Sequence, residues 1–559
     1  MMLKPSSPMI ALLVLASCAS TPEVPAVRFA NAPAVRVVDD RRDVAAKPSE
    51  REFIHSLYHY DGVVQRRLTR AMELPRDRRS LAVNALDEVP DSTWFTNRIG
   101  VRDLTLDELR AGPAKVGSPE AFKPWTVRST RIGGSEHVLM ITDARGRRFM
   151  LKFDSPEFPE QETATHVIVG KLLWACGYNV TEDHVVYFRP AELTLAEDAV
   201  GVDILGDKHP LGRAELDDFL RMVATERDGR IRALASLWLD GKPLGGPPAE
   251  GVREDDPNDR IPHQLRRDLR GAYPIFAWLD HVDIQESNFL DTWVEEGGRH
   301  YVKHYMLDFG KGLGVMDTTG HNPRHGHEYV VDFAEMIRSL ATGGLVERTW
   351  EGRELPGLRG VGMFGVKDYD PGEWKPDSPA YVPLLNADRI DKFWGAKILI
   401  RFTREQIHAV VETARLSDPR AVEYLTDTLV ARQRATARYW FERTNPLDRF
   451  EIAAGAGGVT LCFDDLTLVH GLAQGAAAAT RYGLATYDAE GRALAEPAGV
   501  PASATGRTCS GALTLSGAPG GYTIVRVAME RGDFRGETLV HIARNLDTGV
   551  ARVIGVWRP

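Results

Sequence analysis

Three side chains with oxygen donors, Asp283, Asn288 and Asp308, lie close together in the chain, and Asp308 opens the tripeptide Asp308-Phe309-Gly310. A carboxylate and an amide oxygen are ligands that a hard cation such as magnesium prefers. A second carboxylate can orient a hydroxyl group and accept its proton. This combination suits phosphoryl transfer, in which phosphate charge must be neutralised while the attacking hydroxyl is held in place. The alternative is that these residues only cap ordinary turns.

The surrounding pattern predicts a helix before this set and a hairpin within it. Apolar residues recur at three- and four-residue steps from Leu265 to Leu279, which is typical of a buried helix face, and Pro274 predicts a kink in that helix. Phe289 to Val294 and Tyr301 to Leu307 are typical of two strands, joined by a turn that contains paired glycines. A loop, a hairpin and a second loop would bring the three side chains together.

Upstream, the stretch from Val127 to Asp154 predicts three strands separated by turns. Gly133 and Gly134 fall in the first turn, where backbone amides could cover a phosphate group, although a simple hairpin turn is the plainer interpretation. Lys152 is the single charged residue in the apolar run 149–153. A lysine in such a strand is either a solvated edge residue or a ligand for phosphate.

A helix is predicted from about Pro159 to Cys176, with Gly177 at its C-cap. Glu162 in its first turn is the candidate ion-pair partner of Lys152, and Glu160 is the alternative. Acidic residues in a first turn are also favoured by the helix dipole alone, so both interpretations stay open.

These motifs resemble the atypical branch of the protein-kinase-like superfamily, in the style of the HipA-like and CotH-like bacterial kinases. The run from Leu307 to Gly314 has the pattern Leu-Asp-Phe-Gly-x-x-Leu-Gly. This pattern is also similar to a segment of phosphoinositide kinases. The resemblance covers residues 127–314. Two features depart from the family pattern: Val282 stands where an arginine is usual, and no Ala-Pro-Glu follows Asp308. These departures disfavour regulation by a phosphorylated loop.

The resemblance implies an α+β fold with a two-lobed kinase-like core, a β-rich N-lobe and a helical C-lobe. It implies ATP with Mg²⁺ or Mn²⁺ as cofactors and an unknown protein, sugar or lipid acceptor. The implied catalytic residues are Asp283, His281 and Lys152; the implied nucleotide-binding residues are Lys152, Glu162, Gly133 and Gly134; and the implied metal ligands are Asn288 and Asp308. A pseudokinase or surface interaction protein with the same fold, and an AMP-transferring relative, are the alternatives.

The N-terminus is similar to a bacterial lipoprotein signal peptide. Lys4 precedes a short apolar run, and Leu15-Ala16-Ser17-Cys18 matches the lipobox, whose cysteine is acylated. Several acyl chains on Cys18 would give stable membrane anchoring. Because Ala19 rather than Asp follows the cysteine, the outer membrane is expected over the inner one. An ordinary secretory signal is the alternative.

The composition is typical of a large protein that does not bind nucleic acid. The 559 residues carry a net charge of −9 with acids and bases interspersed, which disfavours a nucleic-acid partner. Of the four cysteines, Cys176 falls on a predicted helix and is expected to be a buried thiol. Cys462 and Cys509 both fall in the last predicted domain, where export would permit a disulfide between them.

We therefore expect six regions. They are a signal peptide (1–17), a flexible tether (18–50), an N-terminal extension (51–120), the kinase-like N-lobe (121–190), the helical C-lobe (191–445) and a small all-β, sandwich-like domain (446–559). A loop with His321, His325 and His327 follows the predicted site. It could bind zinc or substrate, but a solvated loop is the commoner case.

Overall fold

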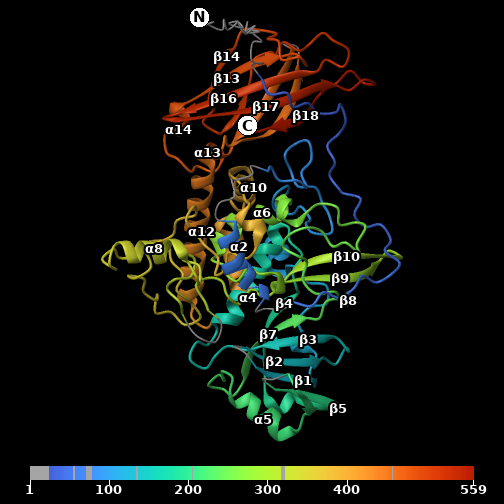
Figure 1. The fold of residues 1–559 in the computed structure, drawn as a ribbon, viewed down its shortest axis with the longest axis vertical. Helices are drawn as coiled ribbons and strands as arrows, with labels where there is room; N and C mark the ends of the chain where they lie inside the picture. The colour runs from blue at the N-terminus through green and yellow to red at the C-terminus, as the bar shows by residue number, and fades with distance from the viewer. Residues whose placement is uncertain are drawn as a thin grey trace, which may run out of the picture.

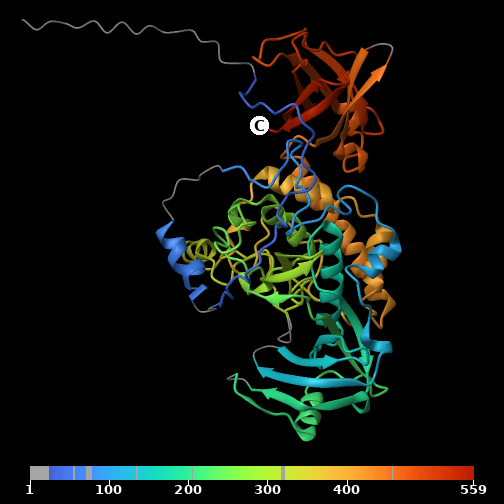
Figure 2. The same cartoon turned by 90° about the vertical axis from the view of Figure 1, so that its right-hand side faces the viewer.

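The computed structural model describes residues 24–53, 57–58, 60–70, 78–133, 136–203, 206–316, 321–455 and 458–559. The predicted signal peptide, Cys18 and Gly134 lie outside these residues. The fold is mixed α+β, with one large sheet and three smaller ones. Along the long axis, the large sheet lies at one end, a helical region in the middle and the C-terminal sheets at the other end (Figures 1 and 2).

The large sheet has seven strands in the order β4-β7-β3-β2-β1-β5-β6. The three strands predicted over 127–154 are present as an antiparallel meander, and β5 joins β1 in parallel. Because β7 inserts between β3 and β4, the sheet extends well beyond the predicted boundary at residue 190. The bounds are β1 Trp125–Gly133, β2 Glu136–Thr142, β3 Arg148–Lys152, β4 Asp183–Phe188, β5 Leu193–Val202, β6 Lys208–Pro210 and β7 Ile231–Leu237, with helix α5 Arg213–Arg221 beside β5.

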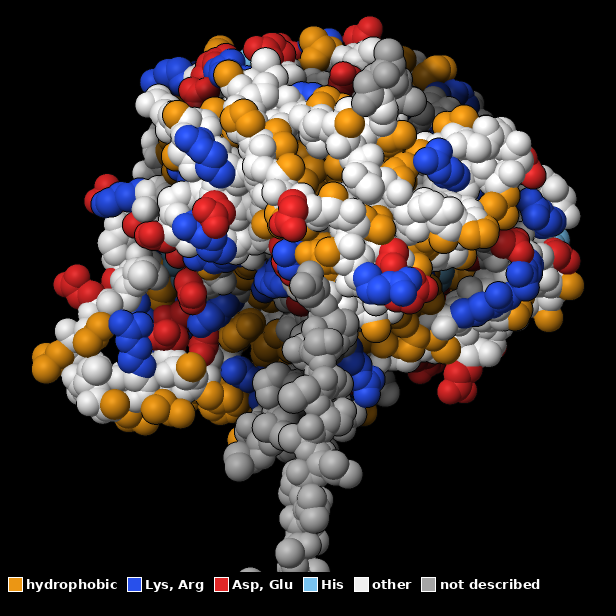
Figure 3. All heavy atoms as spheres, turned by 90° about the horizontal axis from the view of Figure 1, so that it is seen from above, with side chains coloured by type: hydrophobic (Ala, Val, Ile, Leu, Met, Phe, Trp, Pro, Cys, Tyr) orange, Lys and Arg blue, Asp and Glu red, His pale blue; other side chains and the backbone are white. Residues whose placement is uncertain are grey.

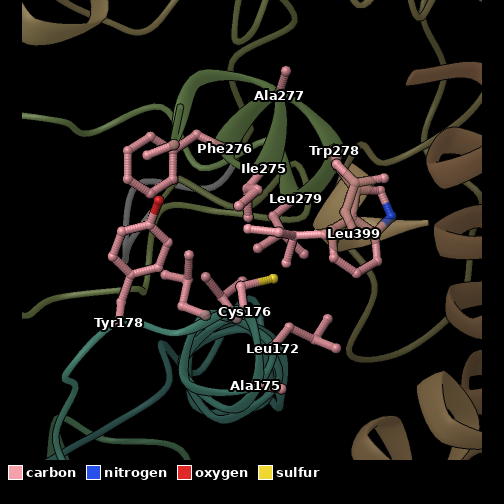
Figure 4. Packing of buried hydrophobic residues seen from close by; sticks show 14 of the residues in the cluster. Leu172, Ala175, Cys176, Tyr178, Ile275, Phe276, Ala277, Trp278, Leu279 and Leu399 are labelled. Carbon is pink, nitrogen blue, oxygen red and sulfur yellow. The ribbon is translucent and has the colours of Figure 1, made fainter. Parts of the chain in front are cut away.

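Helix α4 (Gln161–Cys176) links this sheet to the helical region and is buried on almost every side. It contacts β4 and β7 on one side and α3 (Leu106–Ala111) and α11 (Arg404–Glu412) on another. Figure 4 shows Leu172 and Cys176 of α4 facing Ile275 and Leu279 across one apolar core. Gly177 ends the helix with a φ of +132°, and a Cβ there would lie 2.2 Å from the Phe95 ring, so only glycine fits.

The helix predicted from Leu265 to Leu279 is present as two short pieces, α6 (Arg267–Arg270) and α7 (Tyr273–Leu279). Pro274 lies in the first turn of α7, where its missing N–H costs no helical hydrogen bond. The predicted hairpin follows as β9 (Phe289–Glu296) and β10 (Arg299–Met306), whose turn glycines both have positive φ. Strand β8 (Lys242–Pro243) completes this small sheet.

Of the remaining helices, α10 and α12 pack against α7. Helix α11 begins at a capping box between Thr403 and Gln406, and α12 begins after the cap Asp418. In the described part of the chain, no helix is both long and apolar enough to cross a bilayer. The other bounds are α8 Phe333–Ala341, α9 Val382–Leu385, α10 Arg389–Leu399 and α12 Pro419–Phe441.

Residues 24–50 differ from the expectation of a flexible tether. Val24 is buried in the C-terminal domain, and the Phe29 ring packs on His541 of that domain. Further along, the Asp40 carboxylate accepts hydrogen bonds from the backbone and hydroxyl of Thr93. The segment has almost no regular structure, yet it lies against the body. Beyond it come the π-helix η1 (Tyr60–Gln65) and helix α2 (Arg66–Thr69).

The C-terminal region contains a three-stranded sheet, β11-β12-β15, and a five-stranded sheet, β14-β13-β16-β17-β18, that share one apolar core. Cys462 of β12 and Cys509 of β15, the predicted disulfide pair, are bonded. Two four-residue helices interrupt the strands, so the region is not wholly β as predicted. The bounds are β11 Leu447–Gly455, β12 Gly458–Asp465, α13 Leu466–Val469, α14 Ala476–Ala479, β13 Thr480–Tyr487, β14 Ala498–Pro501, β15 Arg507–Cys509, β16 Thr523–Arg531, β17 Phe534–Arg544 and β18 Ala551–Trp557.

A buried ionic network joins this region to the helical one. The guanidinium of Arg558, 1% exposed, donates to Asp87 at 2.7 Å and to Asp448 at 3.3 Å. Asp87 also pairs with Arg267 of α6. Burial alone would raise the pKa of Asp87, but the two arginines outweigh burial and hold that pKa below its usual value.

Candidate functional site

The site is centred on Asp308, immediately after β10, and on Lys152, the last residue of β3. The Lys152 ammonium donates to Asp308 Oδ1 at 2.8 Å. Asp308 adopts a left-handed backbone conformation with φ of +58°, an unusual conformation for an aspartate that often occurs at functional positions. Its carboxylate is 34% exposed, whereas the lysine side chain is 5% exposed, so the carboxylate forms the open side of the pair.

Electrostatics favour the ionised form of Asp308. Burial by itself would raise the pKa of this carboxyl group. The positive charges of Lys152 and Lys311 and the neighbouring His166 ring outweigh that effect, so the pKa lies well below its usual value. Asp308 is therefore a carboxylate at any physiological pH and is available as an anionic ligand.

Asp283 and Asn288 lie on the loop between α7 and β9, as the spacing predicted. The Lys311 ammonium donates to Asp283 Oδ2 at 3.0 Å, and the Gln285 amide donates to Oδ1 at 3.1 Å. The Asn288 amide nitrogen donates to the Asp283 backbone carbonyl at 2.8 Å. This bond turns the Asn288 amide nitrogen to the loop, while its Oδ1 accepts a hydrogen bond from the Ser287 hydroxyl at 3.5 Å.

His281 differs from its predicted catalytic role. The ring is 3% exposed, its Nδ1 lies 3.1 Å from the Lys311 carbonyl, and it packs edge-on against Phe309. Burial lowers the pKa of His281, so the ring is neutral. Through these contacts it supports the backbone of the 308–311 segment. We therefore assign it as a positioning residue.

The structure distinguishes the two candidate glutamates. A Cβ on Gly310 would lie 3.0 Å from Glu162 Cγ and 3.2 Å from its Oε1, so Glu162 lies directly against the Asp-Phe-Gly segment. Glu160 instead pairs with Arg359 at 2.7 Å and accepts from the Ser417 backbone at 2.8 Å. Glu162 is therefore the acid at the site, and Glu160 holds a distant segment in place.

The predicted phosphate-covering turn falls where β1 meets β2. Gly133 is the last residue of β1 and pairs in register with Glu136 across that turn. Gly134 lies outside the described residues. The turn therefore joins two strands of the same sheet that carries Lys152.

Sequence reasoning missed two contributors. Lys311, directly after the Asp-Phe-Gly motif, contacts Asp283 and so links the two loops of the site. His166 of α4 lies between two carboxylates, 3.1 Å from Asp183 Oδ2 and 3.8 Å from Asp308 Oδ1, and its ring packs on Phe309. The one available signal was that His166 stands one helical turn after Glu162 and therefore shares its face.

The donor set fits a divalent cation with a nucleotide. Asp308 and Asn288 supply a carboxylate and an amide oxygen, and magnesium is commonly held by one or two protein oxygens with phosphates completing its shell. No cluster of three or more His, Cys, Asp or Glu side chains arranged for a metal occurs among the described residues. A metal here would therefore depend on phosphate oxygens for the rest of its ligands.

The three histidines of the 321–327 loop diverge. His325 lies 3.4 Å from Asp377, His321 packs against Phe158, and His327 contacts the Thr349 hydroxyl. His327 lines a polar cavity of about 640 Å³ that also reaches Asp280, three residues before Asp283. Burial first, and then Arg353, lower the pKa of His327 to about 4, so its ring is neutral. The loop thus borders a cavity beside the site and does not gather its histidines for zinc.

No protein-family model matches this chain. A search of curated proteins gave no significant match. Among solved structures, the Golgi casein kinase with Mn/ADP bound aligns with a TM-score of 0.29 and 10% identity, over 60% of this chain and 73% of that one. A second structure of the Golgi casein kinase gives 0.27 and 10%, over 71% and 93%. Likeness at this level does not establish a shared fold, so a kinase-like assignment depends on the side-chain geometry.

Proposed function

We propose that this protein is a kinase-like phosphotransferase that uses ATP and a divalent cation. The observation that carries the proposal is the convergence of four separate segments on one site. A strand lysine (Lys152), a helix glutamate (Glu162), the loop pair Asp283 and Asn288, and Asp308 come together from distant parts of the sequence. Ordinary turn caps would have no reason to meet.

Each residue has a role that its surroundings support. Asp283 would accept the proton of the acceptor hydroxyl, with Lys311 at 3.0 Å stabilising its negative charge. Asp308 and Asn288 would hold the cation, which neutralises phosphate charge when bound. Lys152 would bind the phosphates. Its ammonium group lies 2.8 Å from the Asp308 carboxylate, which would bind the cation that neutralises those phosphates. His281 and Phe309 fix the backbone on which Asp308 depends.

The proposed location is the bacterial cell envelope, with lipid on Cys18 and the outer membrane as the favoured destination. The lipobox at Leu15–Cys18 supports this placement. The Cys462–Cys509 disulfide supports it independently, because such bonds persist in oxidising compartments and are rare in the cytosol. Cys18→Ala should release the protein from the membrane fraction, and an unchanged distribution would contradict lipid anchoring.

The test is a thermal-shift titration of the whole chain with ATP and Mg²⁺ or Mn²⁺, followed by label transfer. A ligand at a hundred times its dissociation constant stabilises the folded state by about 2.7 kcal/mol. Asp308→Ala should lose this shift. Asp283→Asn should keep it while lowering transfer of the γ-phosphate by about 10²- to 10⁴-fold.

Asp107→Asn serves as the matched control, because its side chain is 96% exposed on α3 and should behave as wild type. Absence of a thermal shift in the wild type would rule out nucleotide binding. A shift without any transfer would identify a pseudokinase, and transfer of label from the α-phosphate would identify AMP transfer. Treating labelled envelope extract with protease, glycosidase or organic solvent would then distinguish a protein, sugar or lipid acceptor.

A further inference from the structure

The end of the molecule farthest from the candidate site has an unusual surface. In the five-stranded sheet, β13 ends at Tyr487, β16 begins at Thr523, and β17 turns into β18 between Arg544 and Ala551. The register places these three points at one end of the sheet, which we call the distal end. The opposite end meets the helical region through Val556, whose backbone N–H donates to the Ala85 carbonyl, and through Arg558.

Two large apolar side chains project at the distal end. Leu546 and Val550, in the turn between β17 and β18, are 78% and 62% exposed. Two aliphatic side chains in one short turn form an apolar surface that the described part of the chain leaves largely open to water. Figure 3, which looks onto this end, shows hydrophobic, basic and acidic side chains interspersed on its surface.

Three arginines surround this turn. Arg544 and Arg552 flank it, and Arg552 bonds to Asn31 of the N-terminal segment. Arg28 lies on the same segment and donates to the carbonyl of Ala489 in another distal loop. Within the described residues, none of these three guanidiniums has a carboxylate partner within ion-pair distance. Asp547 is the one acid within the turn, and Asp488 and Glu490 of the neighbouring loop pair with Arg492, so these acids do not neutralise the three arginines around Leu546 and Val550.

The start of the described chain lies at the same end. Val24 is 1% exposed, and its Cγ2 would lie 3.1 Å from a Cβ on Gly491 in a distal loop. Asn31 reaches the carbonyl of Arg544 at 2.8 Å. Six peptide units separate Cys18 from Val24, and even a fully extended chain of that length spans only about 20 Å. A lipid on Cys18 would therefore hold the distal end within about 20 Å of the bilayer surface.

We infer that the β17–β18 turn is a membrane-contact surface, with Leu546 and Val550 inserting into the interface of an anionic bilayer and Arg28, Arg544 and Arg552 binding its headgroups. Lipid is favoured over a protein partner because the site combines aliphatic tips, unpaired cations and proximity to the acylated cysteine. Such a contact is the second signal that complements a lipid anchor. It rests on the proposed lipid anchor at Cys18 and is independent of any phosphotransfer activity.

The test places a fluorescent reporter on the turn of the mature lipoprotein, reconstituted in vesicles of phosphatidylethanolamine and phosphatidylglycerol with spin-labelled lipid. Thr548→Cys offers the reporter position, because Cys176 is buried and Cys462 is bonded to Cys509. Leu340→Cys on α8, 82% exposed, is the matched control position. Quenching at 548 should exceed quenching at 340 by at least about fivefold.

Leu546→Asp with Val550→Asp should reduce quenching at 548 to the level at 340, and purely zwitterionic vesicles should weaken it. Both substitutions are at exposed positions, so the variant should melt at the wild-type temperature. Equal quenching at 548 and 340, quenching that survives the double substitution, or failure of the mature protein to stay with vesicles would each overturn the inference. Protection of residue 548 only by a second protein would do the same.

Discussion

Gly310→Ala tests whether the Asp-Phe-Gly segment must lie against α4 for the site to form. Gly310 has no positive φ, so alanine brings no backbone strain and acts only through its methyl group. That methyl would lie 3.0 Å from Glu162 Cγ, and Glu162 is 4% exposed on a helix that is buried on nearly all sides. Overpacking of this kind costs about 1–3 kcal/mol.

The strain should be relieved by moving residues 308–311 away from α4, because α4 is the more tightly packed partner. Asp308 and Lys152 would then separate, and the affinity for nucleotide and metal should fall at least about tenfold, which corresponds to about 1.4 kcal/mol. The assay is a thermal-shift titration with ATP and Mn²⁺ at fixed protein concentration. We expect a lower melting temperature without ligand and a titration curve displaced to higher ATP.

Gly212→Ala is the matched control, since a Cβ at that position meets no atom within 4 Å and its φ is −93°. If Gly310→Ala and Gly212→Ala gave the same melting temperature and the same ATP titration, the close packing of Glu162 on Gly310 would have no role in the site.

Three further predictions concern stability. Burial lowers the pKa of Lys171 to about 8 from 10.5, so between these pH values the unfolded state binds more protons and the free energy of unfolding rises with pH. In urea unfolding, the free energy of unfolding of wild type relative to that of Lys171→Met should therefore rise by about 3 kcal/mol from pH 7.5 to 10.5. A difference that stays constant over this pH range would contradict a buried amine. Arg558→Ala should destabilise the C-terminal region by about 3 kcal/mol because Asp87 and Asp448 lose a buried partner, and limited proteolysis should then release that region; resistance equal to wild type would refute it. Cys462→Ser opens a loop of 47 residues and should cost about 4 kcal/mol, an effect that dithiothreitol should reproduce in wild type but not in the variant.

The parts of the site that sequence reasoning could predict are those set by local pattern. The hairpin between Asn288 and Asp308 follows from two apolar strands and a glycine pair, and the position of Lys152 follows from its strand. In each case a few neighbouring residues determine the geometry.

The remaining parts depend on contacts between distant segments. Strand β7 enters the large sheet between β3 and β4, and no local pattern at Ile231–Leu237 indicates which strands it will pair with. Residues 24–50 have no periodicity, and their packing on His541 and Thr93 is determined by those partners. Glu160 and Glu162 look equivalent in sequence, but Glu160 has a φ of +70° at the helix start and points elsewhere.

The Arg558 network would also limit which molecules the proposed phosphotransferase could use as acceptors. Arg558 joins the C-terminal sheets to the helical region through buried charge pairs. These pairs hold the two parts at a fixed separation. The distal end and the large sheet lie at opposite ends of the long axis (Figure 1). With its distal end on the bilayer, the molecule would hold Asp283 at a constant distance from the membrane. Headgroups of the anchoring membrane would then be out of reach of Asp283. The accessible hydroxyls would be those of molecules that occupy the space above it, such as proteins and polysaccharides of the envelope.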